Sequence, residues 1–283
     1  MNCASPVLGQ YRCGKCVPCR SYDRQQWVFR LRMELDASDF GLFTTLTYND
    51  DNLPAAGVSK RDCQLFLKRL RKHYSSNTLR YYIVSEYGDH TLRPHYHGLL
   101  FFKNATLGPS VYDNIESSWQ NGYVGFGECN EATIVYCTKY CLKGSNIPAG
   151  AEKNFRLLSK MNGGIGYTYI EKQREYHMTR LAQPTMAYFR TDTAPLPRYY
   201  RQKYLDSLPD DEREDIKKQY LEYLAQQRYD SYDKDFKKYL HRLHISSSQA
   251  GHAEFVRYDD YLQQKQRIRE EIILKHTKKQ SIW

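Results

Sequence analysis

The sequence predicts an α+β protein built on a central antiparallel β-sheet, with helices packed against one face. Two observations lead to this prediction: the order strand, helix, strand, strand, strand, helix in the first half of the chain, and the short turn-rich loop between two of these strands. A short loop favours antiparallel pairing, because parallel neighbours need a long crossover. A Cys-rich segment precedes these elements and a helical tail follows them, so we expect three regions: residues 1–36, 37–200 and 201–283.

The first strand and the helix after it are predicted from composition and spacing. Residues 43–48, FTTLTY, are rich in threonine and aromatic side chains and end at a cluster of turn-forming residues. Ser59 stands three residues before Asp62, which resembles a capping box. Apolar side chains then recur at helical spacing at Cys63, Phe66, Leu67, Leu70 and Tyr74. Basic residues fill the positions between them, so this is a basic amphipathic helix.

Two further strands are expected at residues 80–87, RYYIVSEY, and 95–102, HYHGLLFF. Residues 123–126 are a candidate fourth strand. Asn130 can cap a helix over residues 131–143, which Gly144 can end. Glycine and proline punctuate residues 145–200, where we expect loops and short elements. A helix is expected to start after Ser207, with Pro209 in a first-turn position, and a second one to occupy about residues 252–276.

Composition points to a polyanionic partner. The formal net charge is +10, and residues 1–200 carry 25 Lys+Arg against 17 Asp+Glu, whereas residues 201–283 carry 17 against 15. A basic protein with 26 tyrosines suits single-stranded nucleic acid, whose bases stack on aromatic rings. A soluble basic protein without such a partner is the plainer alternative. The residues we expect to contact DNA are Lys68, Arg69, Arg71, Lys72, Arg93 and Lys143.

The cysteines indicate a metal rather than disulfides. No apolar run approaches the length of a membrane span, and cysteines stand where a signal peptide needs an apolar core, so we expect an intracellular protein without a membrane partner. In a reducing compartment, four cysteines within nineteen residues favour metal binding. We expect Cys3, Cys13, Cys16 and Cys19 to hold a structural zinc ion, with reduced cysteines in a basic loop as the alternative.

The stretch RPHYHGLLFF, residues 93–102, carries a candidate metal site. Successive side chains of a strand point to opposite faces, so His95 and His97 share one face. If the two strands pair antiparallel, Glu86 can share that face, giving two imidazoles and one carboxylate. Three ligands leave open coordination positions, as a catalytic metal requires. Donor type alone leaves iron, zinc and manganese open, and two solvated histidines are the simpler alternative.

A candidate nucleophile lies on the helix that follows. In YCTKY, residues 136–140, the two tyrosines are four apart, so Tyr136, Lys139 and Tyr140 can lie on one face with Lys143 just beyond. Such a tyrosine pair is more often a packing stripe than a catalytic element. Its position downstream of the histidine pair is what makes it a candidate.

In this order, FTTLTY, RPHYHGLLFF and YCTKYCLK resemble the three motifs of the HUH endonucleases that initiate rolling-circle replication. The wider pattern resembles the replication initiators of Microviridae, specifically the gokushovirus-like phages. It consists of CGKCVPCR at 13–20 before Trp27, SEYGD at 85–89, GIGY at 164–167 and PRYY at 197–200. The resemblance covers roughly residues 10–200, and the tail matches no motif.

The resemblance implies a palm-like sheet, a Mg²⁺ or Mn²⁺ ion and a pair of nucleophilic tyrosines. A divalent ion on His95, His97 and Glu86 is then expected to polarise the scissile phosphate of origin DNA while Tyr136 or Tyr140 attacks it. Lys139 is expected to assist the phenol, whose pKa lies near ~10, or to neutralise the phosphate. The products are a 5′-phosphotyrosine and a free 3′ hydroxyl, which a host polymerase, working with a host helicase, extends in the bacterial cytoplasm.

Three alternatives stay open at this point. A relaxase or transposase would use the same HUH chemistry on another substrate. A non-catalytic, zinc-stabilised single-stranded DNA-binding protein would explain the charge and the cysteines. A non-haem iron oxygenase would explain the two histidines and the carboxylate, but it gives no reason for YCTKY or for the basic charge.

Overall fold

The computed structural model describes residues 12–75, 78–139, 147–246, 248 and 250–279, which form two compact units. One unit comprises Arg24–Lys172, and the other combines the segment before residue 24 with the segment after residue 172. These limits differ from the three regions expected from the sequence, whose boundaries at 36 and 200 stay predictions. Within the described residues, no helix has both the length and the apolar character needed to cross a membrane.

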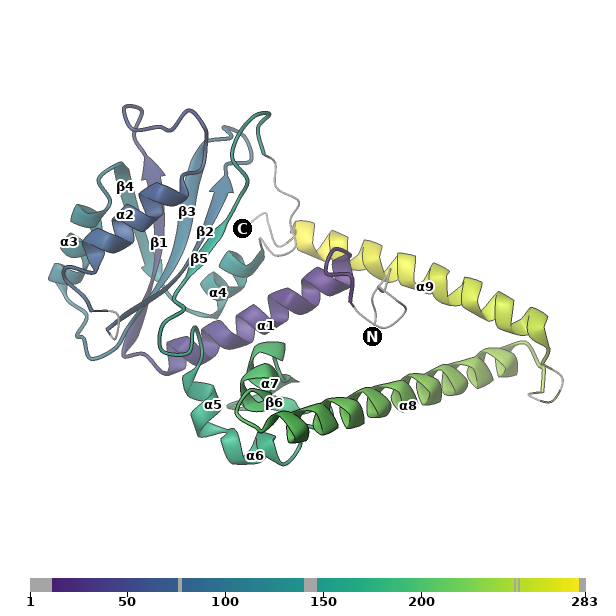
Figure 1. Ribbon diagram of the computed structural model, residues 1–283. Helices are drawn as coiled ribbons and strands as arrows, with labels where there is room; N and C mark the ends of the chain where they lie inside the picture. The colour runs from purple at the N-terminus through teal and green to yellow at the C-terminus, as the bar shows by residue number, and fades with distance from the viewer. Residues whose placement is uncertain (1–11, 76–77, 140–146, 247, 249, 280–283) are drawn as a thin grey trace. The chain divides into compact units, whose positions relative to one another are not determined.

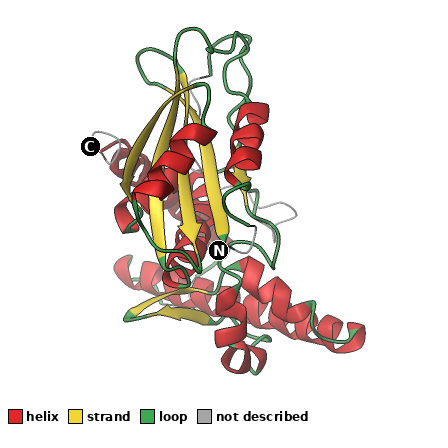
Figure 2. Ribbon diagram, turned by 90° about the vertical axis from the view of Figure 1, so that its left-hand side faces the viewer, coloured by secondary structure: helices red, strands yellow, loops and turns green. Residues whose placement is uncertain are grey.

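The Arg24–Lys172 unit is built on one antiparallel sheet of five strands, in the spatial order β4-β1-β3-β2-β5 (Figure 1). Figure 2 shows this sheet as a single twisted layer. The strands are β1 (Phe40–Tyr48), β2 (Leu79–Tyr87), β3 (Pro94–Phe102), β4 (Gly122–Glu128) and β5 (Arg156–Leu158), and all neighbours pair antiparallel. The α+β class, the antiparallel sheet and the pairing of β2 with β3 are therefore confirmed.

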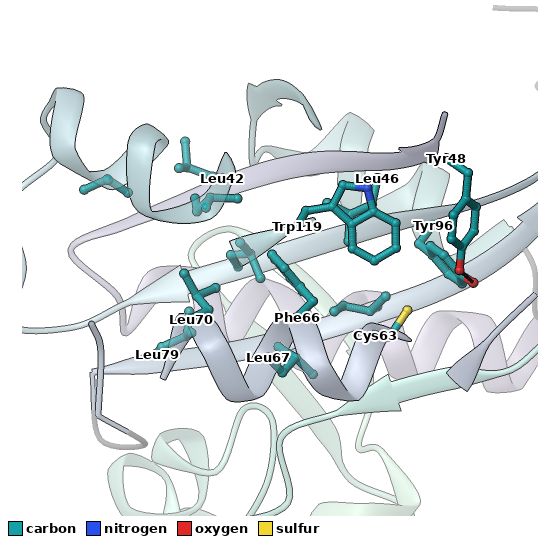
Figure 3. Packing of buried hydrophobic residues seen from close by; sticks show 14 of the residues in the cluster. Leu42, Leu46, Tyr48, Cys63, Phe66, Leu67, Leu70, Leu79, Tyr96 and Trp119 are labelled. Atoms are coloured by element: carbon teal, nitrogen blue, oxygen red, sulfur yellow. Dashed lines mark hydrogen bonds between the residues drawn. The ribbon is translucent and has the colours of Figure 1, made fainter. Parts of the chain in front are cut away.

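One face of the sheet is covered by α2 (Lys60–Leu70) and α3 (Pro109–Ser118). Ser59 caps α2 as expected, since its hydroxyl accepts the N–H of Asp62 at 3.1 Å. Phe66 and Leu70 are fully buried against the sheet (Figure 3), and each such side chain adds about 1.5–3 kcal/mol by leaving water. The predicted helical stripe is thus the buried face of α2.

The opposite face is covered by α1 (Val17–Asp36) and α4 (Glu131–Thr138), so the expectation of helices on one face only was wrong. Trp27 and Leu31 of α1 and Ile134 of α4 pack on Tyr82, Val84, Leu99 and Phe101 of the sheet. The physical reason is that β2 and β3 are almost continuously buried, on alternate residues of both faces, which requires a layer on each side. Asn130 caps α4 as predicted, whereas the expected end of this helix at Lys143 and Gly144 lies outside the described residues.

Helix α1 was not predicted from the sequence, because its buried face carries charge. Arg30 donates from Nε and a terminal nitrogen to the carbonyl of Ile165, each at 3.1 Å. The Glu34 carboxylate accepts the N–H of Gly166 at 2.6 Å and pairs with Arg80 at 2.7 Å. These contacts hold GIGY against α1 and place it just before α5 (Thr168–Lys172).

The other unit contains short elements followed by the helical tail. Its short elements are α6 (Arg174–Met178), the antiparallel pair β6 (Met186–Phe189) and β7 (Asp192–Pro195), and α7 (Arg198–Leu205). The tail consists of α8 (Asp210–Arg242) and α9 (His252–Lys279), which confirms both expected helices. Phe236, Leu240 and Tyr258 form the buried contact between them.

Candidate metal and nucleophile site

His95 and His97 lie on β3 and face the same side of the sheet as α4, while Tyr96 between them points to the α2 side. Tyr96 is fully buried there, and its hydroxyl lies 2.8 Å from that of Tyr48. The His97 side chain is 7% exposed, and that of His95 is 20% exposed. The strand alternation predicted for this motif is therefore present, with His95 on the more open side.

The register of β2 against β3 brings Glu86 to the two histidines. Glu86 pairs directly with His95, and its Oε2 lies 3.3 Å from Nε2 of His95 and 3.1 Å from Nε2 of His97. The rings of the two histidines are 4.9 Å apart and nearly perpendicular. One ligand atom from each of the three residues falls within 4.8 Å of the others. The three side chains that the sequence analysis grouped are therefore together in the structure.

Hydrogen bonds to the other ring nitrogens orient the two histidines. Nδ1 of His95 lies 3.2 Å from the carbonyl oxygen of Arg93. A carbonyl can only accept, so Nδ1 carries the proton and Nε2 of the neutral ring presents a lone pair. Nδ1 of His97 lies 3.2 Å from the hydroxyl of Thr45 on β1. When Nδ1 donates to that hydroxyl, Nε2 of His97 also presents a lone pair toward Glu86.

This donor set fits a divalent cation. Burial lowers the pKa of His97, against the opposing effects of the Glu86 hydrogen bond and charge, so the neutral imidazole that binds metals is favoured near neutral pH. Two neutral Nε2 atoms and a carboxylate oxygen then point their lone pairs at one another at just over 3 Å. A shared cation removes this repulsion, and two imidazoles with one carboxylate suit Mn²⁺ and related ions.

Tyr136 reaches this cluster from the facing helix. Its hydroxyl lies 3.2 Å from Nε2 of His97, and the two rings meet edge to face at 4.9 Å. Nζ of Lys139 lies 3.6 Å from the centre of the Tyr136 ring. Phe43 of β1 stacks on the His97 ring at 5.6 Å and meets Tyr136 edge to face. A phenol, an ammonium group and the candidate metal ligands are thus in direct contact.

Several other predicted site residues are not in this cluster. Tyr140 and Lys143 lie outside the described residues. Helix α2, which carries Lys68, Arg69, Arg71 and Lys72, packs on the opposite face of the sheet from the histidines. Arg69 donates to the carbonyl of Ser118 at 2.8 Å, and Arg93 bonds the Tyr48 carbonyl and the Asp50 carboxylate. Contact of these side chains with DNA stays a prediction.

Thr45 and Phe43 were not predicted as site residues. They belong to FTTLTY, whose composition indicated a strand but not its partner in the sheet. Pairing of β1 with β3 puts Thr45 directly opposite His97. A signal was available in the alternation of FTTLTY, which places Phe43 and Thr45 on a common face, but only the sheet order reveals what that face meets.

The cysteines divide into two groups. The sulfurs of Cys13, Cys16 and Cys19 gather within 4.8 Å of one another, while Cys3 lies outside the described residues. Cys63, Cys129 and Cys137 are buried in the hydrophobic core, as expected for small apolar side chains. Cys141 is outside the described residues.

Comparison with known proteins gives consistent relatives. A family model of phage replication-associated proteins, described under the name "Replication-associated protein ORF2", matches residues 41–145, the segment with Glu86, His95, His97 and Tyr136. The "Replication-associated protein VP4" of Bdellovibrio phage phiMH2K is 28% identical over 220 residues, which cover 71% of this chain and 69% of that protein. The "Replication-associated protein ORF2" of Spiroplasma virus 4 is 26% identical over 293 residues, covering 94% and 84%.

A third relative, the "Replication-associated protein ORF4" of Chlamydia phage 1, is 26% identical over 181 residues, covering 56% of this chain and 45% of that protein. No solved structure matches the chain significantly. The resemblance to phage replication initiators that the motifs indicated is thereby confirmed.

Proposed function

We propose that this Microviridae-like replication initiator nicks single-stranded origin DNA by attack of Tyr136 at a divalent-metal site and later rejoins the strand, as HUH endonucleases do. The observation that carries the proposal is the position of the Tyr136 hydroxyl, 3.2 Å from a nitrogen that also faces Glu86. An abundant aromatic residue used for packing would have no need of a polar contact with two histidines and a carboxylate.

Glu86, His95 and His97 would hold the metal through Oε2 and the two Nε2 atoms. A bound Mg²⁺ or Mn²⁺ ion supplies positive charge beside the scissile phosphate and the leaving 3′ oxygen. Thr45 and the Arg93 carbonyl keep the ligand nitrogens unprotonated and correctly directed, since each bonds the other nitrogen of its ring.

Tyr136 supplies the nucleophile. Its oxygen forms a bond to phosphorus while the bond from phosphorus to the 3′ oxygen breaks; the phenol loses its proton and the 3′ oxygen gains one. The Lys139 ammonium over the ring stabilises the developing phenolate. Because one phosphoester replaces another, the stored bond can be rejoined without ATP. The free 3′ hydroxyl serves as a primer for the host polymerase, with a host helicase, in the bacterial cytoplasm.

Tyr140 is proposed as the second acceptor on sequence grounds. A tyrosine four residues after Tyr136 follows at one helical turn. With two phenols, one can hold the 5′ end of the displaced strand while the other cuts the regenerated junction.

The test uses circular single-stranded phage DNA, Mg²⁺ or Mn²⁺, and a denaturing gel with 5′-end detection of protein-linked DNA. We expect metal-dependent nicking with the protein attached to the 5′ end, and its loss in the His95→Ala/His97→Ala double variant. DNA binding should persist in that variant, because the basic surface supplies salt-sensitive affinity. Undiminished nicking by the double variant would overturn the proposal.

The same assay separates the alternatives. A non-catalytic single-stranded DNA-binding protein would retard the DNA without any covalent adduct. A relaxase or transposase would form the adduct but would not release a closed single-stranded circle from a DNA that carries two copies of the origin. An oxygenase would show no metal-dependent reaction with DNA.

A further inference from the structure

The segment that leads into α1 brings three cysteine sulfurs to one point, in a part of the chain that the nicking chemistry does not use. Sγ of Cys13 lies 3.9 Å from Sγ of Cys19, and Sγ of Cys16 completes a group within 4.8 Å. Cys19 is 4% exposed, and Cys13 and Cys16 are partly buried. The arrangement comes from the spacing Cys-x₂-Cys-x₂-Cys, in which the last two cysteines flank the start of the helix.

The backbone around Cys13 is shaped for an anionic sulfur. The N–H groups of Lys15 and Cys16 both donate to Sγ of Cys13, at 3.4 and 3.3 Å. Gly14 between them has φ +71°, a left-handed conformation that folds the chain back over the sulfur. Backbone donors favour the thiolate over the thiol, and thiolate is the form that binds metals.

The distances fit one tetrahedral ion. Zinc–sulfur bonds of about 2.3 Å give a tetrahedral edge of about 3.8 Å, close to the Cys13–Cys19 separation of 3.9 Å. A disulfide needs its sulfurs at about 2.05 Å. An iron–sulfur cluster holds its ligands around several irons, which requires wider spacing than that of one ion. The geometry therefore selects a mononuclear site.

We infer that Cys13, Cys16 and Cys19 bind one zinc ion with all three sulfurs as thiolates, and that Cys3 from the preceding segment supplies the fourth ligand. Binding releases the thiol protons and stabilises the first turn of α1, where the Cys16 carbonyl accepts the N–H of Arg20 at 3.0 Å. The ion is structural, since four sulfur ligands leave no open position for a substrate.

Zinc content measured on the full-length protein purified without chelators tests the inference. We expect about one zinc per chain, retained in the His95→Ala/His97→Ala variant and lost in Cys16→Ser. Cys63→Ala and Cys137→Ala, which remove buried core cysteines, should keep the ion. Zinc absent from the wild-type protein, or iron with inorganic sulfide in its place, would overturn the inference.

Trypsin gives a second readout that does not depend on how the variants fold. Lys15 and Arg20 are cleavage sites within the proposed zinc segment, so cleavage of the wild-type protein after these residues should accelerate when a chelator removes zinc and slow again when zinc is restored. Identical cleavage with and without bound zinc would show that the ion does not order this segment.

A different observation concerns the sheet next to Glu86, His95 and His97. Phe43, Thr45 and Thr47 of β1 face the histidine side and are only half-buried, whereas the alternate β1 residues are buried under α2 and α3. Beyond β1, at the edge of the sheet, β4 presents Tyr123 and Gly125 on the same side, opposite Thr47 and Thr45 (Figure 1). An open strip of sheet thus runs from the histidines to Tyr123.

Gly125 has no structural reason to be glycine. A Cβ atom there would meet only Thr45, at 3.8 and 4.0 Å, which is ordinary contact, and its φ is not in the left-handed region. Gly127, by contrast, would bring a Cβ to 3.2 Å from Phe43. A glycine in the interior of a strand, open to solvent and without strain, marks a place where a ligand approaches the backbone closely. Tyr123 beside it is 71% exposed.

We propose that the strip holds the single-stranded DNA next to the scissile phosphate, with its backbone over Gly125 and a base stacked on Tyr123. The proposal rests on the function proposed above, because DNA at the cluster must continue across an adjoining surface. The opposite side of the site carries the Lys139 ammonium, which complements the phosphate charge. Aromatic rings hold bases of any sequence by stacking.

Binding of a labelled origin strand without divalent metal, followed by fluorescence anisotropy, tests the strip. Tyr123→Ala should weaken binding by about 10-fold with an unchanged salt dependence, since it removes stacking and no phosphate contact, and Tyr123→Trp should restore it. Tyr229→Ala removes a tyrosine of similar exposure, 69%, in the helical tail and serves as the control. Gly125→Val should also weaken binding, although a β-branched residue suits a strand, so misfolding is not the cause.

Wild-type affinity in both Tyr123→Ala and Gly125→Val, in a protein that still nicks DNA, would overturn the strip and leave the proposed function intact. Weakened binding in both variants, together with a wild-type protein that never nicks, would support the strip and overturn the catalytic proposal.

Discussion

The hydroxyl of Tyr136 lies 3.2 Å from Nε2 of His97, which joins the candidate nucleophile to the candidate metal ligands across the gap between α4 and the sheet. Tyr136→Phe keeps the ring that packs on Phe43 and removes only the oxygen. We therefore expect a folded protein that binds origin DNA but forms no covalent adduct in its first turnover. The measurement is adduct formation on a labelled strand.

The matched control for this variant is Tyr81→Phe. Tyr81 is a partly buried tyrosine of β2 that packs on the α2 side of the same sheet, and its hydroxyl accepts a hydrogen bond from Arg71. It should nick normally. A normal yield of adduct from Tyr136→Phe would assign the attack to another residue.

Tyr140→Phe is expected to separate nicking from termination. With Tyr136 intact, first-turnover cleavage should proceed, but release of closed circles should fall to background because the second acceptor is missing. The assay follows linear adduct and circular product from a strand with two origin copies. Circular product at the wild-type level would show that one tyrosine suffices.

Thr45→Val should reduce metal affinity without touching a ligand. Valine has the shape of threonine but removes the hydroxyl 3.2 Å from Nδ1 of His97, so the ring loses its orienting partner. Such partners contribute about 10–100-fold to metal affinity, and Mn²⁺ titration of the purified protein measures the loss. Thr47→Val is the control, since its hydroxyl bonds the Tyr123 carbonyl instead. Equal affinities in the two variants would contradict this role of Thr45.

The sequence predicted the cluster of Glu86, His95 and His97 because the three residues lie on neighbouring strands joined by a short loop. Local alternation and one hairpin were enough to place them on a common face. It did not predict Thr45, because the pairing of β1 with β3 joins residues that are far apart in the chain and depends on the order of the whole sheet.

Helix α1 was missed for a different reason. Its buried side includes Arg30 and Glu34, which satisfy backbone groups of residues 165 and 166, so the apolar stripe that reveals a helix is interrupted by charge. A buried ion pair becomes favourable only when its partners are present, and Arg80 comes from a distant strand. The elements that sequence periodicity revealed are those whose burial is purely apolar.

The Glu34–Arg80 contact should therefore contribute to folding in a way that one substitution exposes. Both side chains are almost completely buried, and Lys103 lies 3.7 Å from the same carboxylate. Glu34→Ala leaves the Arg80 guanidinium without its anion, which we expect to lower the free energy of unfolding by about 3–5 kcal/mol. Urea denaturation measures this loss.

The double variant Glu34→Leu/Arg80→Met is the informative comparison. It removes both charges together, so it should recover most of the stability lost in Glu34→Ala. If the double variant were as unstable as Glu34→Ala, the loss would come from packing or from the Gly166 hydrogen bond rather than from an uncompensated charge.

His177 gives the protein a defined dependence of stability on pH. Its ring is fully buried in the unit formed by the segments before residue 24 and after residue 172, beside Tyr204 and Tyr176. Burial, with a smaller effect of the Arg180 charge, lowers the pKa of His177 to about 4. In the unfolded chain the pKa returns to about 6.5.

Between these two values the unfolded chain binds a proton that the folded chain does not. The contribution of His177 to the free energy of unfolding is therefore complete above pH ~6.5, decreases as the pH falls, and levels off below about 4. His177→Gln replaces the imidazole with a neutral amide that does not titrate. Urea denaturation of both proteins at several pH values should show the stability difference between wild type and variant shrinking by a step within this window. A difference that stays constant from pH 7 to about 4 would mean that the folded protein protonates His177 as readily as the unfolded chain does.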